Sequence, residues 1–82
     1  MNREKIEENL SEYIAALTGT ETEIKAETKL AEMDVDSISL VKIFVFIERT
    51  FGISLLDAGL SRDQIETFGS LVQYINQTLE NK

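Results

Sequence analysis

The feature that most constrains the fold is a nearly unbroken apolar run over residues 38–47. Its β-branched and aromatic side chains are typical of a buried strand. The run is longer than a typical strand, however, and the chain offers only the short segment 53–56 to pair with it. Asp36 and Gly52 flank it at the positions of a helix N-cap and a C-terminal glycine. The pattern therefore predicts a helix over residues 36–51.

A helix over this segment carries more apolar surface than one core face needs. One stripe holds Val41, Phe44, Ile47, Glu48 and Phe51, with Ile38 and Val45 to its side and Ile43 and Phe46 further round. Helices that are apolar on most sides either lie at the centre of a core or present a partner-binding face. In a domain of this size one helix can do both.

Two further segments repeat apolar residues at helical spacing. The first covers residues 3–17, ends near Gly19 and places glutamates on its other faces. The second follows Thr67, a residue suited to an N-cap. The apolar positions are Ile6, Leu10, Tyr13, Ile14 and Leu17 in the first segment and Phe68, Leu71, Val72, Ile75 and Leu79 in the second. Both segments are predicted to form amphipathic helices.

The connections are less regular. Residues 18–35 have no sustained period, but their spaced apolar side chains predict an ordered loop pinned to the core. Those side chains are Ile24, Leu30, Met33 and Val35. Ser61 and Gln64 form a capping-box pattern that predicts a short helical turn through Ile65. The predicted fold is therefore all-α: a four-helix bundle of three longer helices and one short helix, with a long first loop, in a single domain over residues 1–82.

The composition narrows the chemistry. The 82 residues include no cysteine and no histidine, which excludes disulfides, a Cys/His zinc site and the commonest general acid/base. We expect no catalytic residue and no metal site, because so small a domain rarely encloses a substrate pocket. The net charge of −7 argues against nucleic acid as a partner. No segment has the apolar length of a signal-peptide core or a membrane span, which predicts a cytoplasmic protein with no membrane contact.

The segment 33–40 joins the long loop to the apolar helix and reads Met-Asp-Val-Asp-Ser-Ile-Ser-Leu. Its simplest interpretation is an N-cap. A calcium loop starting at Asp34 fails because Val45 stands where an EF-hand has glutamate. A catalytic Ser37 fails because the chain has no histidine base and no glycine-flanked serine. A phosphate ester on Ser37 would be stabilised, since the N-terminus of a helix favours negative charge.

The apolar helix and its flanks resemble the pattern of the acyl carrier protein family, in which Asp-Ser-Leu precedes an amphipathic helix that ends in Phe-Gly-Ile. The matching residues are Asp36-Ser37-Ile38, Val41, Ile43, Ile47, Glu48, Phe51-Gly52-Ile53 and Leu55. The segment 67–75 is similar to the entry of the family's last helix, and a long first loop also belongs to that fold. The resemblance spans nearly the whole chain and implies a bundle of acyl-carrier type.

The resemblance implies that Ser37 carries a covalent 4′-phosphopantetheine arm, which a phosphopantetheinyl transferase installs from coenzyme A with Mg²⁺. The thiol of the arm bears an acyl group as a thioester, so the protein shuttles acyl intermediates and is not an enzyme. Its partners would be an acyltransferase, a ketosynthase or other acyl-processing enzymes, which it meets as a monomer. Asp36 matches the transferase recognition motif. The residues expected to face partners are Ile38, Val41, Lys42 and Val45.

Three features depart from the family pattern. Asp34 stands where glycine is usual. Lys42 and Arg49 lie on a helix face that is usually acidic, so partners that dock through basic patches would be met less favourably. Phe44 and Phe46 are bulkier than usual and are expected to fill or reshape the acyl-chain cavity. These departures favour a specialised carrier in a polyketide, fatty-acid-like or other secondary biosynthetic pathway.

Two alternatives remain open. One is a peptidyl or aminoacyl carrier protein, which usually has Gly-Gly before the serine motif, where this chain has none over residues 33–35. The other is an acidic helical interaction domain without a prosthetic group, in which the apolar residues of segment 38–47 bind a partner and Ser37 is only part of a cap. The initial methionine and the short tail suit a free-standing protein, with an excised synthase domain as the alternative.

Overall fold

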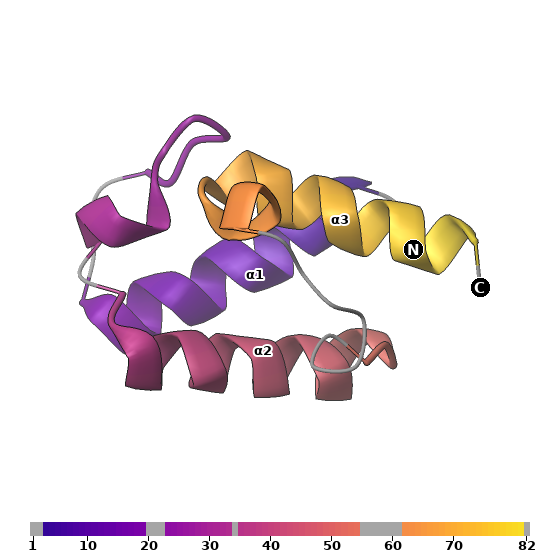
Figure 1. The fold of residues 1–82 in the computed structure, drawn as a ribbon, viewed down its shortest axis with the longest axis horizontal. Helices are drawn as coiled ribbons and strands as arrows, with labels where there is room; N and C mark the ends of the chain where they lie inside the picture. The colour runs from indigo at the N-terminus through magenta and orange to yellow at the C-terminus, as the bar shows by residue number, and fades with distance from the viewer. Residues whose placement is uncertain (1–2, 20–22, 34, 55–61, 82) are drawn as a thin grey trace.

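The computed structural model describes residues 3–19, 23–33, 35–54 and 62–81. Three α-helices make up most of this part: α1 (Arg3–Thr18), α2 (Ser37–Phe51) and α3 (Phe68–Glu80). Figure 1 shows α2 along one side of the molecule and α3 along the other, and α1 packs against both. The described ranges contain no β-strand, and none of their helices is long and apolar enough to cross a membrane. The predicted all-α fold is confirmed.

The helices begin and end where local chemistry favours it. Asp36 caps α2, and Gly52 ends it in the left-handed region at φ 70°, where its backbone N–H donates to the carbonyl of Glu48. Gly19 follows α1 at φ 72°. Thr67 and Ser70 form a capping box at the start of α3, each side chain accepting from the other residue's backbone N–H at 3.1 Å. These ends satisfy backbone groups that a helix otherwise leaves without partners.

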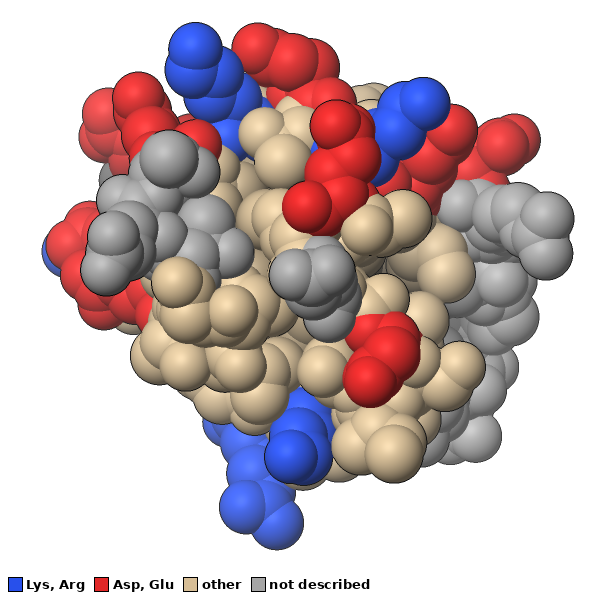
Figure 2. All heavy atoms as spheres, turned by 90° about the vertical axis from the view of Figure 1, so that its left-hand side faces the viewer, with Lys and Arg blue, Asp and Glu red and all other residues tan. Residues whose placement is uncertain are grey.

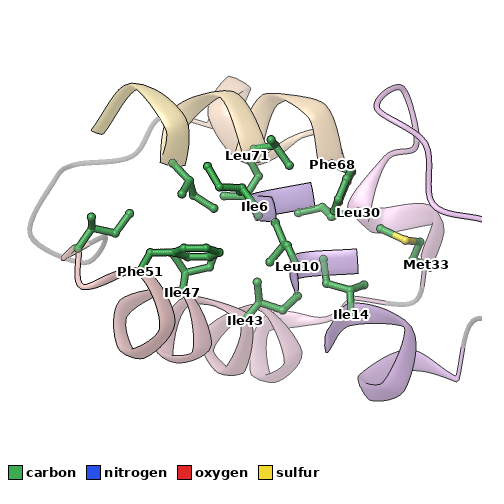
Figure 3. Packing of buried hydrophobic residues seen from close by; sticks show 13 residues of the cluster. Ile6, Leu10, Ile14, Leu30, Met33, Ile43, Ile47, Phe51, Phe68 and Leu71 are labelled. Carbon is green, nitrogen blue, oxygen red and sulfur yellow. The ribbon is translucent and has the colours of Figure 1, made fainter. Parts of the chain in front are cut away.

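Apolar side chains from all three helices meet in a single core, shown in Figure 3. The side chains with no exposed surface are Ile6, Leu10 and Ile14 of α1, Ile43 and Ile47 of α2, and Leu71, Val72 and Ile75 of α3. Tyr13, Leu17 and Leu79 pack half-buried against this core. The apolar positions predicted for the first and last helices are therefore confirmed.

The sequence pattern leaves open which side of α2 faces the core, and the structure decides it. Its buried residues are Ile43, Ile47 and Phe51, while 53% of Val41 is exposed. Ile43, which the pattern placed away from the stripe, lies at the centre of the core. Because apolar residues surround this helix, its packing against α1 rather than its own periodicity decides which face is buried.

The long first loop is pinned to the core as predicted. Leu30 and Met33, the ends of a short 3₁₀ helix η1 (Leu30–Met33), are buried, and Ile24 and Val35 pack half-buried against the core. Three backbone hydrogen bonds then tie this loop to the entry of α3. The N–H of Leu30 donates to the carbonyl of Glu66 at 3.0 Å. The N–H of Phe68 donates to the carbonyl of Thr28 at 2.8 Å, and that of Gly69 to the carbonyl of Ala26 at 2.8 Å. An isolated antiparallel bridge between Lys29 and Thr67 completes the contact.

The predicted short fourth helix is not found as an α-helix in the described residues. A 3₁₀ helix, η2 (Arg62–Ile65), occupies its place. Ser61, the first residue of the predicted capping box, lies outside the described residues.

Gly69 sits where the loop touches α3 and leaves no room for a side chain. A Cβ at this position would lie 2.8 Å from the carbonyl oxygen and 2.9 Å from the Cβ of Ala26. We expect Gly69→Ala to lower the stability by about 1–3 kcal/mol net, because the overpacking outweighs the roughly 1 kcal/mol that alanine gains in helix propensity. Thermal unfolding followed by circular dichroism measures the net loss. Adding Ala26→Gly to the Gly69→Ala variant should recover only part of the lost stability, since it removes the Cβ of Ala26 but leaves its carbonyl oxygen in place. An unchanged melting temperature in Gly69→Ala would contradict the close approach.

Candidate functional site

Ser37 presents its hydroxyl at the start of a helix. It is the first residue of α2, and its side chain is exposed. Within the part of the chain that the structure describes, its hydroxyl forms no hydrogen bond. The positive end of the helix dipole and the N–H groups of the first turn lie beside it. A phosphate ester at this oxygen would therefore stand in solvent at the favourable end of the helix.

Asp36 holds the backbone that presents Ser37. Its backbone is extended, and its Oδ1 accepts a hydrogen bond from the N–H of Ser39 at 2.8 Å. The backbone N–H of Ser39, and then its hydroxyl, lowers the pKa of the Asp36 carboxyl. A carboxyl with a lowered pKa is ionised at neutral pH. The predicted N-cap is confirmed, and its negative charge lies at the N-terminus of α2.

The cap should give the protein a measurable pH dependence. Because the folded pKa of Asp36 is lowered, its charge stabilises the fold above the unfolded pKa of 3.8, and this contribution is lost as pH falls through the folded pKa. Asn keeps the capping hydrogen bond but not the charge. We therefore expect Asp36→Asn to melt a few degrees below the unmodified protein at neutral pH, with the gap closing at acid pH. A gap that stays constant down to pH of about 2 would contradict this assignment.

The four residues predicted to face partners lie together on α2, away from the core. Ile38 is 69% exposed and Val41 53% exposed, and among the described residues they are the two large apolar side chains that are exposed. Lys42 is exposed, and Val45 is half-buried without joining the core. The structure thus brings all four onto the surface that follows Ser37. Their role in binding partners stays a prediction.

A groove beside this surface was not anticipated from the sequence. The ring of Tyr13 on α1 stacks on that of Phe46 at 4.1 Å between centroids, and its hydroxyl donates to the backbone carbonyl of Lys42 at 3.4 Å. A groove of about 440 Å³ is lined by Tyr13, Val41, Lys42, Val45, Phe46, Arg49 and Thr50. Tyr13 matched the core-facing period of the first helix, so no local pattern marked it as a surface residue.

The two phenylalanines of α2 have different surroundings. Phe46 contacts two other rings. It stacks on Tyr13, and it meets Phe51 edge-on with the two ring centroids 6.5 Å apart. Phe44 packs half-buried against the core. Their expected effect on an acyl-chain cavity stays a prediction, and Asp34, the other departure from the family pattern, lies outside the described residues.

Comparisons with known proteins place this site in a family. Residues 8–75, which include Ser37, match the family model of the phosphopantetheine attachment site. The meromycolate extension acyl carrier protein of Mycolicibacterium smegmatis is 34% identical over 80 residues, which cover 95% of this chain and 79% of that protein. The acyl carrier protein of Thermotoga maritima is 32% identical over 80 residues, which cover 95% of this chain and 96% of that protein. No solved structure is a significant match.

The chain belongs to the acyl carrier protein family. Members of this family are carriers rather than enzymes, and phosphopantetheine is their prosthetic group. In general they interact with acyl-processing enzymes and a phosphopantetheinyl transferase. The predicted family, carrier role and cofactor are confirmed.

Proposed function

We propose that this chain is a single carrier domain that shuttles acyl intermediates on a 4′-phosphopantetheine arm attached to Ser37. The observation that carries the proposal is the exposed hydroxyl of Ser37 at the start of α2, without a hydrogen bond among the described residues. The family match supports it, because residues 8–75 include Ser37.

The proposed pathway is a fatty-acid-like, polyketide or other secondary biosynthetic pathway. The proposed compartment is the cytoplasm. Relatives that are named for meromycolate extension support a pathway that extends acyl chains. The same relatives favour an acyl carrier over a peptidyl or aminoacyl carrier.

Each residue around the attachment point has a proposed task. When attached, the arm supplies a thiol that carries an acyl group as a thioester. Ser37 holds the phosphate of the arm at the positive end of α2. Asp36 fixes the helix start and offers its carboxylate to the transferase. The surface that partners contact consists of Ile38, Val41, Lys42 and Val45.

Mass spectrometry tests the proposal directly. The protein is incubated with coenzyme A, Mg²⁺ and a promiscuous phosphopantetheinyl transferase, and the intact mass is compared before and after. We expect a gain of one phosphopantetheine. No gain, with a transferase that modifies another carrier protein in the same tube, would contradict the proposal and favour an acidic interaction domain without a prosthetic group.

A further inference from the structure

One face of α2 combines exposed or half-buried apolar side chains with two cations. It consists of Ile38, Val41, Lys42, Val45 and Arg49, which fall within about 100° of the helical wheel, and is here named the α2 face. Lys42 and Arg49 are both exposed. They are two helical turns apart, about 10 Å along the axis, so both project from the same side.

The groove beside this face is lined by aromatic and aliphatic side chains together with two basic ones. The stacked rings of Tyr13 and Phe46 lie within it, and the hydrogen bond from Tyr13 to the carbonyl of Lys42 holds the tyrosine in place. Lys42 and Arg49 both line the groove. An apolar side chain that entered this groove would therefore have a cation near it in each direction along the helix.

The charge of the α2 face is opposite to that of the chain, whose net charge is −7. Among the described residues neither Lys42 nor Arg49 forms an ion pair. Figure 2 shows basic side chains at the lower edge of the viewed face, on the side of α2 in Figure 1, while its upper half carries most of the acidic side chains with further basic ones among them. The helix macrodipole accounts for Arg49 in the last turn but not for Lys42 in the middle of the helix.

We propose that the α2 face and its groove bind a partner protein through an acidic surface. An apolar side chain of the partner enters the groove, and carboxylates on either side of it pair with Lys42 and Arg49. The inference rests on the proposed function, since the partner would be an acyl-processing enzyme that the carrier visits. The net charge of −7 disfavours both an anionic membrane and a second copy of this chain as the occupant.

Two helical peptides of about 15 residues serve as probes, long enough to form helix once stapled. They share the same leucine and phenylalanine positions and differ only in glutamate or lysine at the flanking positions. NMR titration of the isotope-labelled apo protein locates the binding site of each. We expect the glutamate peptide to shift the resonances of Val41, Val45 and Phe46. An absence of shifts at the α2 face, or equal shifts there with the lysine peptide, would overturn the proposal.

Charge reversal then tests the two cations against a matched control. Lys42→Glu with Arg49→Glu should weaken the glutamate peptide at least about tenfold. Lys25→Glu with Lys29→Glu makes the same change in net charge at exposed residues of the long loop, and should leave the affinity almost unchanged. Circular dichroism checks that both variants fold. Equal weakening by the two pairs would mean that only net charge matters and would refute a local site.

Two further measurements address the other occupants. One is binding to vesicles of phosphatidylglycerol and phosphatidylcholine, and the other is self-association measured by sedimentation. Either result, if it took place through the α2 face, would overturn the proposal. The peptide titration needs no prosthetic arm and is repeated with Ser37→Ala. If the arm attaches but no peptide binds, the carrier function stands and this inference fails. If the peptide binds but no arm attaches, the surface stands and the carrier function fails.

Discussion

Replacing Ser37 with alanine is expected to abolish the mass gain produced by coenzyme A, Mg²⁺ and a phosphopantetheinyl transferase. The hydroxyl oxygen of Ser37 is the proposed point of attachment, and alanine offers no atom to which the phosphate can be joined. The fold should survive, because the hydroxyl has no hydrogen bond among the described residues and the cap is made by Asp36. The expected result is therefore complete loss of modification at an unchanged melting temperature, measured by intact-mass analysis and circular dichroism.

Ser39→Ala provides the matched control. Ser39 lies in the same helical turn, half-buried, and its backbone N–H donates to the carboxylate of Asp36. That N–H remains in the alanine variant, so the modification should proceed. Full modification of Ser37→Ala would place the arm on another hydroxyl and would disprove the assignment.

The second large effect is expected at Ile43, which has no exposed surface. Ile43→Ala removes buried methyl groups and leaves a cavity, which costs about 2–5 kcal/mol in comparable cores. A domain of this length has a total stability of about 4–12 kcal/mol. The variant should therefore lose a large fraction of its stability, measured as a lower midpoint of urea unfolding.

Val41→Ala is the comparison on the same helix. Val41 is 53% exposed, so its truncation should change stability by no more than about 0.5 kcal/mol. Equal losses at the two positions would show that α2 is rotated about its axis relative to the described packing.

The sequence predicts the helices of this fold well because each end has its own chemical signal. Asp36, Gly52 and Thr67 are capping residues whose roles depend on the nearest turn alone. The helical spacing of apolar residues is also enough to predict the first and last helices, since polar residues cover their other faces. The prediction of Ser37 as the candidate site likewise depends on its place beside Asp36 at a helix start, and it stays a prediction.

Contacts between distant segments escape such reasoning. The burial of Ile43 rather than Val41 depends on how α1 packs against α2. The bridge between Lys29 and Thr67 joins residues far apart in the chain, and neither residue lies in a pattern that predicts a partner. The stacking of Tyr13 on Phe46 likewise requires the two helices to be in place. Local propensity does not contain this information, which is a property of the assembled core.

The stacked position of Tyr13 allows binding at the α2 face to be followed by tyrosine fluorescence. The chain has no tryptophan, two tyrosines and four phenylalanines, so excitation beyond the phenylalanine absorption band gives emission from tyrosine alone. One of these rings lies in the groove at the edge of the α2 face. A tryptophan brought close by an arriving protein would accept excitation energy from that ring, and the tyrosine emission would fall as the complex forms. Encounters with this surface can thus be timed in stopped flow without attaching any dye.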